Sequence, residues 1–170
     1  MLTHARLLKM VDYNPGTGVF TWRIAPKKGP DRTGLRAGTV SKIRPTCTRP
    51  YRQIRIDGKT YFEHRLAWFH VHGRWPQGIL DHINFDSLDN RIANLREATH
   101  STNKANRPPP KNNSTGYKGV SFNKVYGKFQ ASICRQYKQM HLGFFDAAEE
   151  AHAAYRAAAV ELFGAFARTA

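Results

Sequence analysis

Three consecutive prolines, Pro108 to Pro110, constrain the fold of this 170-residue chain more than any other feature. A proline tract cannot continue a helix, because each ring fixes the φ angle and removes a backbone N–H donor. The tract instead favours an extended polyproline II conformation. The sequence therefore predicts a domain at 1–106 with a β-rich N-terminal extension, a basic Pro/Asn-rich linker at 107–116 and a second domain at 117–166. Modules of roughly 100 and 60 residues can each bury a core.

The balance of charged residues points to a polyanionic partner. Lys and Arg number 27 against 12 Asp and Glu, which gives a formal net charge of +15. Two long stretches, 32–56 and 98–145, contain no acidic residue. Their basic residues alternate with Tyr, Phe and Ile at strand spacing, which favours a binding surface over the plainer alternative of a solvated or disordered face. The composition is therefore typical of a nucleic-acid-binding protein.

Membrane insertion and a zinc or disulfide framework are not expected. No apolar stretch approaches the roughly 18 residues that a membrane-spanning helix needs, and the segment from Met1 to Val11 is too polar for a secretory signal. Cys47 and Cys134 lie far apart, and neither belongs to a Cys-x-x-Cys pair. We therefore predict no structural zinc and no membrane partner, and we expect a soluble, intracellular protein.

Local patterns predict an α+β first module. Alternating apolar and polar residues between turn residues indicate strands, and apolar residues at intervals of three and four indicate helices. The predicted elements are a hairpin within 13–22, a strand near 38–43, two strands within 51–63 joined at Asp57-Gly58, a helix over 64–72, a helical stretch over 89–95, and a helix from its N-cap Thr99 through Asn106.

The second module is predicted to be a three-stranded antiparallel sheet packed on one C-terminal helix. The strands are expected from alternating runs at 117–122, 128–135 and 139–144. Asp146 and Glu149 match a capping-box pattern at the start of the helix, and Gly164 is the expected end. The helix face predicted to lie on the sheet consists of Ala147, Ala151, Ala154, Tyr155, Ala158 and Leu162.

The segment from Asp81 to Asn103 carries the residue types that metal-assisted phosphodiester hydrolysis needs. The reaction requires a hard cation to neutralise charge on the phosphate and a base to deprotonate the attacking water. Asp81 offers an anionic oxygen, and His82 offers a base with a free pKa of about 6.5. Asn103 could return an amide oxygen to the same cation, and Asn94 could hold the ends of the loop together. The plainer alternative is a polar surface turn.

The order of these residues resembles a known family. Along the chain stand His64-Arg65-Leu66, Asp81-His82-Ile83, Asp89-Asn90-Arg91-Ile92, Asn94-Leu95-Arg96 and Asn103. The order resembles the HNH, or ββα-metal, nucleases of the phage and homing endonuclease type, over roughly 13–106. The resemblance implies that His82 is the general base, that Asp81 and Asn103 bind a divalent metal, with Mg²⁺ expected, and that Asn94 gives structural support. Many members have His at the Asn103 position, so the metal preference stays open.

Alternatives remain for four other residues of this module. His64 either approaches the scissile phosphate as a second catalytic residue or supports the site as a buried, hydrogen-bonded histidine. Arg65, Arg91 and Arg96 could bind DNA phosphates, but pairing with a carboxylate is an equally good interpretation for each. The candidate carboxylates are Asp86, Asp89 and Glu97.

The second module resembles another family. The segments Tyr117–Phe122, Gly127–Ala131, His141–Asp146 and Ala148–Tyr155 are together similar to the APETALA2/ethylene-response-factor DNA-binding domain. The resemblance implies a sheet that enters the major groove, about 12 Å wide, with the helix packed behind it. The implied DNA contacts are Lys118, Lys124, Tyr126, Lys128, Arg135, Lys138 and His141, and the expected core residues are Phe122, Phe129, Ile133, Phe145 and Tyr155. Base specificity cannot be transferred, because Ser132, Cys134 and Gln139 replace residues common in plant members.

Together these patterns predict a divalent-metal-dependent DNA endonuclease of the homing type, which nicks or cuts duplex DNA and is directed by its C-terminal sheet. The expected partner is double-stranded DNA, with a monomer as the simplest assembly. The expected location is the cytoplasm of a bacterial or phage-infected cell, in association with the nucleoid. One alternative is a DNA-binding transcriptional regulator with a non-cleaving HNH-like domain. Another is a nonspecific nuclease or toxin domain, which would leave the second module without a purpose.

Overall fold

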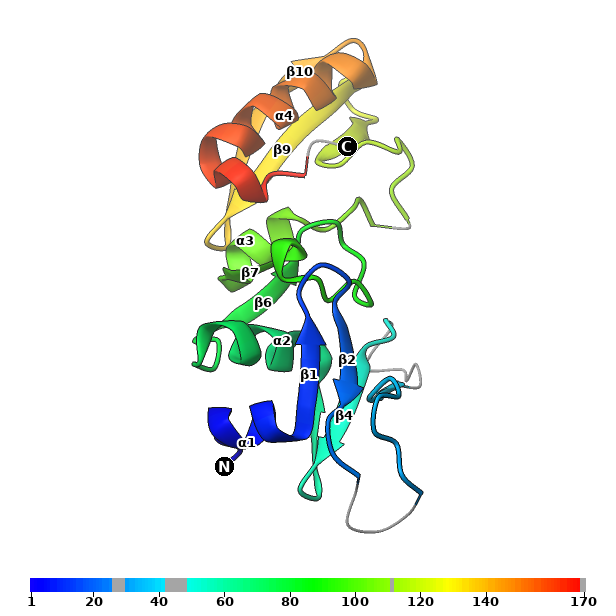
Figure 1. Ribbon diagram of the computed structural model, residues 1–170. Coiled ribbons are helices and arrows are strands. Elements are labelled where there is room, and N and C mark those ends of the chain that lie inside the picture. Colours follow the sequence, from blue (N-terminus) through cyan, green and yellow to red (C-terminus); the bar gives the residue numbers. More distant parts are fainter. Residues whose placement is uncertain (26–29, 42–48, 111, 169–170) are drawn as a thin grey trace. The chain divides into compact units, whose positions relative to one another are not determined.

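The computed structural model describes residues 1–25, 30–41, 49–110 and 112–168 (Figure 1). The chain forms two compact units, Met1–Glu97 and Ala98–Ala170. The division between the units lies before the proline tract, whereas the sequence predicted a boundary at the tract itself. The reason is that Ala105, in the short helix between the two positions, is buried in the C-terminal core beside Ile133 and Tyr155.

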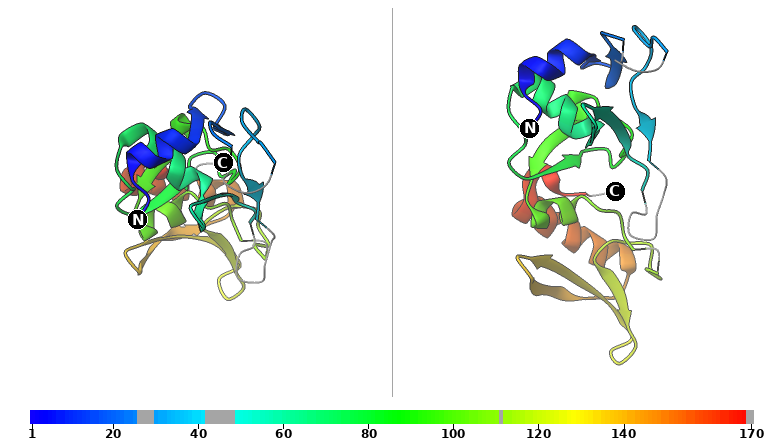
Figure 2. Two further views of the ribbon diagram at one scale, coloured as in Figure 1. Left: turned by 60° about the horizontal axis from the view of Figure 1, so that its bottom comes forward. Right: turned by 90° about the horizontal axis from the view of Figure 1, so that it is seen from below.

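The N-terminal unit is a mixed α/β structure (Figures 1 and 2). Its elements are α1 (His4–Met10), β1 (Val11–Asn14), β2 (Val19–Trp22), β3 (Thr39–Val40), β4 (Arg52–Ile56), β5 (Lys59–Phe62), α2 (Glu63–His72), β6 (Ile79–His82), the 3₁₀ turn η1 (Ile92–Asn94) and β7 (Leu95–Ala98), whose last residue lies at the unit boundary. The strands form the sheets β1-β2, β3-β4-β5 and β6-β7.

Helix α1 and the hairpin β1–β2 supply much of the N-terminal core. The Thr3 side chain caps α1 by accepting a backbone N–H of the first turn, and Leu7 and Met10 are buried. In the hairpin, Tyr13 pairs with Phe20, and their ring centroids are 4.7 Å apart. The predicted hairpin is confirmed. Helix α1 was not predicted, although a capping Thr followed by apolar residues at helical spacing is a recognisable start signal.

The predicted hairpin β4–β5 is also confirmed, together with its turn. Asp57 and Gly58 both have positive φ angles, 48° and 80°, as a two-residue turn between twisted strands requires. The strand expected near 38–43 appears as the short β3, which pairs with β4. Residues 42–43 lie outside the described residues, as does Cys47.

The prediction of a helical stretch over 89–95 was wrong. Only the single 3₁₀ turn Ile92–Asn94 forms, and the buried Leu95 then begins β7, which pairs with β6. Local apolar spacing suggested a helix, but tertiary pairing with a distant strand decided the conformation. The helix over 64–72 is confirmed as α2, and it ends at Gly73, which has a left-handed φ of 67°.

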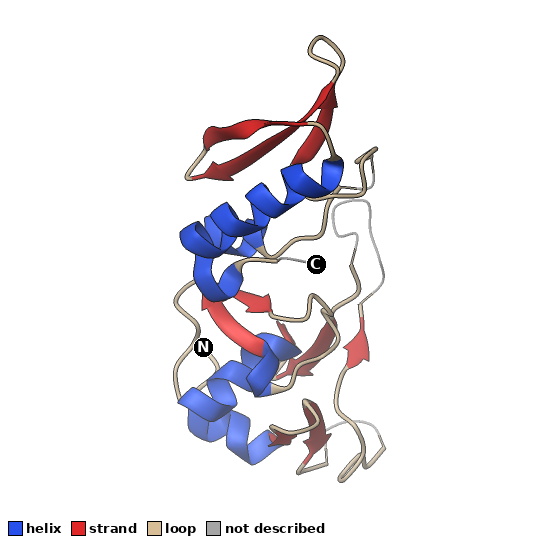
Figure 3. Ribbon diagram, turned by 90° about the horizontal axis from the view of Figure 1, so that it is seen from above, coloured by secondary structure: helices blue, strands red, loops and turns tan. Residues whose placement is uncertain are grey.

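The C-terminal unit is a three-stranded antiparallel sheet that packs on one long helix (Figure 3). Its elements are α3 (His100–Ala105), β8 (Val120–Asn123), β9 (Lys128–Arg135), β10 (Lys138–Phe145), α4 (Ala148–Phe163) and the 3₁₀ turn η2 (Gly164–Phe166). The strand order is β10-β9-β8, as a meander predicts. In the described parts of the chain, no helix is both long and apolar enough to cross a bilayer.

Two details of the C-terminal unit differ from prediction. The helix α4 has Ala147 as its N-cap without a side-chain cap, and Asp146 pairs with Lys128 at 3.1 Å instead. The helix therefore starts one residue later than a cap by Asp146 would require. Its buried face is also rotated slightly, and the buried residues are Ala151, Tyr155, Ala159 and Phe163. The cap of α3 by Thr99 and the end of α4 at Gly164 are confirmed.

Candidate active site

The strand β6 ends at the two residues that sequence analysis placed at the centre of the chemistry. Asp81 and His82 are both buried, with exposed fractions of 4% and 7%. Neighbouring residues of a regular strand point to opposite faces, but β6 stops at His82. A turn follows at once, in which the N–H of Phe85 donates to the carbonyl of His82 at 2.9 Å. The chain can therefore change direction directly after the histidine.

Asn94 closes the loop that follows His82. Its side-chain amide donates to the carbonyl of Asp89 at 2.8 Å, and its side-chain oxygen accepts from the N–H of Asn84 at 2.9 Å. Its backbone carbonyl accepts from the N–H of Ile83, also at 2.9 Å. One buried side chain thus holds both ends of the loop, and these are the bonds expected of a structural asparagine.

Burial favours the neutral form of the His82 imidazole. Burial lowers the pKa of His82, although the hydrogen bond with Asn90 and the carboxylate of Asp81 act in the opposite direction. The ring of His64 meets it edge-on with 5.3 Å between centroids, and the Tyr51 ring lies 6.3 Å away. A neutral imidazole at neutral pH is the form that can accept a proton.

His64 belongs to the same group of rings and is partly buried. Its centroid lies 5.5 Å from those of both Phe62 and Tyr51. Burial, with smaller effects from the charges of His82 and Arg65, lowers the pKa of His64 to about 3. The side chain is therefore uncharged at neutral pH, which favours the supporting role over that of a cationic phosphate contact.

Asp81 is engaged by an arginine from the neighbouring strand. The Nε atom and a terminal nitrogen of Arg96 lie 2.9 and 2.8 Å from Oδ2 of Asp81, and the Arg96 side chain is mostly buried. Of the two interpretations open for Arg96, pairing with a carboxylate is the one the structure supports, but the partner is Asp81 and not one of the three candidate carboxylates. The pair keeps the buried charge of Asp81 compensated.

The donors fit a hard divalent cation in kind. Mg²⁺ prefers oxygen ligands and is often held by one or two protein groups, with water and substrate phosphate completing its shell. Asp81 has a carboxylate and Asn103, in α3, has an amide oxygen, which are ligand types of this kind. The described residues contain no cluster of three His, Cys, Asp or Glu side chains that could hold a metal. The binding of one cation by both Asp81 and Asn103 stays a prediction.

The other two arginines of the N-terminal module make internal contacts. Arg65 donates to the carbonyls of Gly78 and Pro76 at 3.3 and 3.4 Å. Arg91 forms a two-pronged ion pair with Asp89 at 2.8 and 2.6 Å, and this pair lowers the pKa of Asp89 to about 2. Arg91 remains half exposed, so it can still contact a phosphate.

In the C-terminal unit, successive side chains of each strand point alternately to the core face and the outer face of the sheet. Ala131 and Ile133 are buried against α4, so Ser132 points to the other face of β9, where His141 stands opposite it in the register. Aromatic rings gather on this outer face: Phe144 lies 4.7 Å from His141 and 4.9 Å from Tyr126 between centroids. Of the five expected core residues, Ile133 and Tyr155 are buried, whereas Phe122 is 48% exposed.

The lysines predicted to contact DNA differ in their solvent exposure and in their partners. Lys118 donates to the carbonyl of Ala105, and burial together with Arg168 lowers its pKa to about 8. Lys128 forms the exposed pair with Asp146. Lys124, Arg135 and Lys138 are exposed. Lys118 thus has a structural task that the sequence did not reveal.

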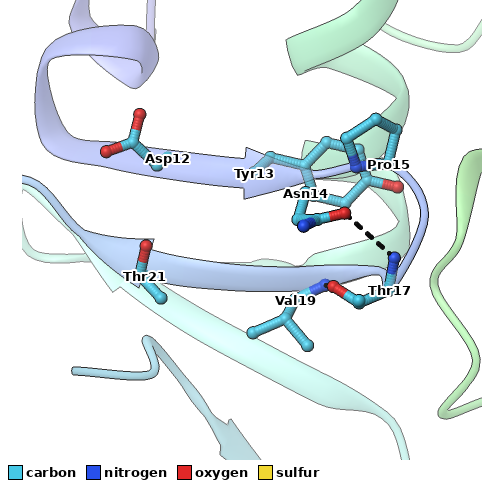
Figure 4. Close-up of a pocket in the computed structure, with 7 residues that line it drawn as sticks. All are labelled: Asp12, Tyr13, Asn14, Pro15, Thr17, Val19 and Thr21. Atoms are coloured by element: carbon cyan, nitrogen blue, oxygen red, sulfur yellow. Dashed lines mark hydrogen bonds between the residues drawn. The ribbon is translucent and has the colours of Figure 1, made fainter. Parts of the chain in front are cut away.

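Residues of the hairpin β1–β2 line a pocket (Figure 4). The hairpin also contacts the loop that follows His82. Asn14 shapes the tip by accepting the N–H of Thr17 at 3.1 Å. The Tyr13 hydroxyl donates to the backbone carbonyl of Asn90 at 2.7 Å, and the N–H of Ile92 donates to the Pro15 carbonyl at 3.4 Å. No local sequence pattern indicates these contacts.

Comparison with known proteins agrees with this geometry. The sequence profile of the HNH endonuclease family matches residues 61–105, which contain α2, β6, β7 and α3. The chain therefore contains an HNH endonuclease domain at residues 61–105. A phage relative is protein 3.8 of Escherichia phage T7, which is 33% identical over 106 residues, covering 62% of this chain and 87% of the phage protein. The family match ends before the C-terminal sheet.

Proposed function

We propose that the protein is a divalent-metal-dependent DNA endonuclease with His82 as its general base. The observation that carries the proposal is the buried pair Asp81-His82 at the end of β6, beside a loop that Asn94 closes. Burial lowers the pKa of His82, so the imidazole is ready to take a proton at neutral pH. A carboxylate next to such a base suits hydrolysis of a phosphodiester near a cation.

In the proposed reaction, His82 removes a proton from a water molecule as the water oxygen attacks the phosphorus. A new P–O bond forms and the ester P–O bond to the leaving oxygen breaks, which leaves a nick or a double-strand break. Asp81 and Asn103 would hold Mg²⁺, which supplies charge neutralisation at the phosphate when bound. Arg91, exposed at the edge of the loop, would contact the DNA backbone, and Arg65 and His64 would support the loop and the base from within.

We further propose that the outer face of the C-terminal sheet directs the protein to its DNA site, as in the APETALA2-like domains that the sequence resembles. The face carries polar and aromatic side chains, and the segment 98–145 lacks acidic residues. Lys124, Arg135 and Lys138 would bind phosphates, and Tyr126 and His141 would approach the bases. A role as a homing enzyme of a phage or intron is compatible with the phage relative.

Incubation of supercoiled duplex plasmid with the purified protein tests this function. We expect cleavage with Mg²⁺ or Mn²⁺ and none with EDTA. His82→Ala should abolish cleavage, whereas the matched control His72→Ala, which removes an exposed imidazole of the same unit, should not. DNA binding without cleavage across several metals and DNA substrates would instead identify a non-cleaving DNA-binding protein.

A further inference from the structure

A buried carboxylate lies behind the proposed base and has no assigned task. Glu63, the first residue of α2, is completely inaccessible to solvent. The Nε atom of Arg52 lies 3.0 and 3.1 Å from its two oxygens, and the Asn90 side-chain amide donates to Oε2 at 3.2 Å. Burial raises the pKa of Glu63, and the charge and hydrogen bond of Arg52 oppose the rise. A buried carboxylate is costly, so its partners are expected to matter.

The backbone leaves room for this carboxylate. Gly38 has a φ of +78°, and a Cβ atom there would lie 2.5 Å from Oε1 of Glu63. The carbonyl of the same glycine accepts a hydrogen bond from Arg52 at 3.2 Å. A side chain at position 38 would therefore collide with the carboxylate that Arg52 binds.

The chain of contacts continues from Glu63 to His82. Asn90 is 1% exposed, and its Oδ1 lies 3.3 Å from Nε2 of His82. An ionised carboxylate can only accept hydrogen bonds, so the NH₂ group of Asn90 must face Glu63 and its oxygen must face His82. That oxygen can only accept, so Nε2 of His82 must carry the proton. The basic lone pair of the neutral ring is then on Nδ1.

We propose that Arg52, Glu63 and Asn90 act in series as positioning residues that fix the tautomer of His82, with hydrogen on Nε2 and the basic lone pair on Nδ1. The inference deepens the proposed function, because it rests on His82 as the base for its catalytic meaning. The tautomer itself can be measured without any cleavage assay.

Nitrogen NMR of the full-length protein with isotope-labelled histidine measures this tautomer directly. Long-range proton–nitrogen correlations at neutral pH show which ring nitrogen carries hydrogen, and the His82 signals are identified by their loss in His82→Asn. We expect the Nε2–H form in the wild type. Glu63→Gln, which lets the Asn90 amide turn either way, and Asn90→Ala, which removes the acceptor, should both give a mixture with Nδ1–H.

Glu97→Gln is the matched control. Glu97 forms a two-pronged pair with Arg74 at 3.0 and 2.9 Å in the same unit but makes no contact with His82. This variant should keep the wild-type tautomer. If Glu63→Gln does not fold, Glu63→Asp serves in its place, because the shorter carboxylate keeps the charge and withdraws from Asn90.

The outcomes are distinct. An Nδ1–H wild type, or an unchanged Nε2–H form in either folded variant, overturns the inference. In a cleavage assay, Glu63→Gln should lower kcat by about tenfold with little change in KM, a loss in the range seen when an outer partner of a site residue is removed. If the wild type cleaves no DNA, the proposed function fails, but the tautomer measurement still decides the inference.

Discussion

At the level of single residues, the main feature is the pair of neighbouring imidazoles of His64, which is partly buried, and His82, which is buried. Both have lowered pKa values, in each case chiefly through burial. A histidine that is neutral when folded and free to take a proton when unfolded couples stability to pH. The unfolded chain binds a proton below about pH 6.5, whereas folded His64 does so only at about 3. The contribution of neutral His64 to the free energy of unfolding is therefore fully present above pH 6.5, and it is lost as the pH falls toward 3.

His64→Phe should weaken this pH dependence. The ring volume is kept, but the titrating group is removed, so the free energy of unfolding should fall less steeply with decreasing pH than in the wild type. The difference can reach about 1.4 kcal/mol per pH unit for one group. Urea denaturation between neutral and mildly acidic pH measures it. Equal slopes in wild type and variant would contradict the buried neutral state, and His72→Phe is the exposed control.

We expect two lysines to have different roles: Lys118 stabilises the fold, and Lys124 binds DNA. Lys118→Met leaves the carbonyl of Ala105 without its donor, so we expect a stability loss of about 1–3 kcal/mol. Lys124→Met removes an exposed charge, so its stability should stay within about 0.5 kcal/mol. The Lys124 variant should instead bind DNA less tightly, with the salt dependence reduced by about one phosphate contact. Thermal unfolding and salt titrations of binding test both, and the opposite pattern would reverse the two roles.

At the level of secondary-structure elements, the hairpin β1–β2 packs against the loop that contains Asn90. Gly18 has a φ of +72°, and a Cβ atom there would lie 2.5 Å from the N atom of Arg91 and 2.6 Å from the carbonyl carbon of Asn90. The hydroxyl of Tyr13 holds the same segment. The hairpin lies outside the family match at 61–105, yet it determines where the loop can lie.

Gly18→Ala should therefore displace the loop as well as strain the turn. Gly34→Ala is a matched control, because Gly34 has a φ of +77° but no atom within 4 Å of the added Cβ. The Gly18 variant should be less stable than the Gly34 variant by about 1–3 kcal/mol, the usual cost of overpacking. It should also shift the NMR signals of His82. Similar losses in both variants would show that backbone strain alone matters.

The elements also show what the sequence could and could not predict. Hairpins with strong turn signals, such as Asp57-Gly58, and the meander of the C-terminal unit follow from local patterns. The stretch 89–95 does not, because its conformation depends on pairing with β6. Asp81, His82 and Asn94 stood out in the sequence, but Arg52 and Glu63 carry no local signal. Their roles depend on contacts between residues far apart in the chain.

At the scale of the whole molecule, the chain combines an HNH unit with a basic C-terminal unit built on a small sheet. The net charge of +15 provides attraction to DNA that does not depend on sequence. We therefore assign DNA affinity to the charges of both units and hydrolysis to the residues at the end of β6. Changes at His82 should alter the rate of cleavage and leave DNA binding nearly intact.

Single-turnover cleavage of duplex DNA by His82→Ala, at enzyme concentrations that saturate the DNA, tests whether His82 is the general base. We expect a rate at least about 100-fold below that of the wild type, the usual contribution of a general base, with unchanged DNA affinity. Cleavage by His82→Ala at the wild-type rate would contradict this role.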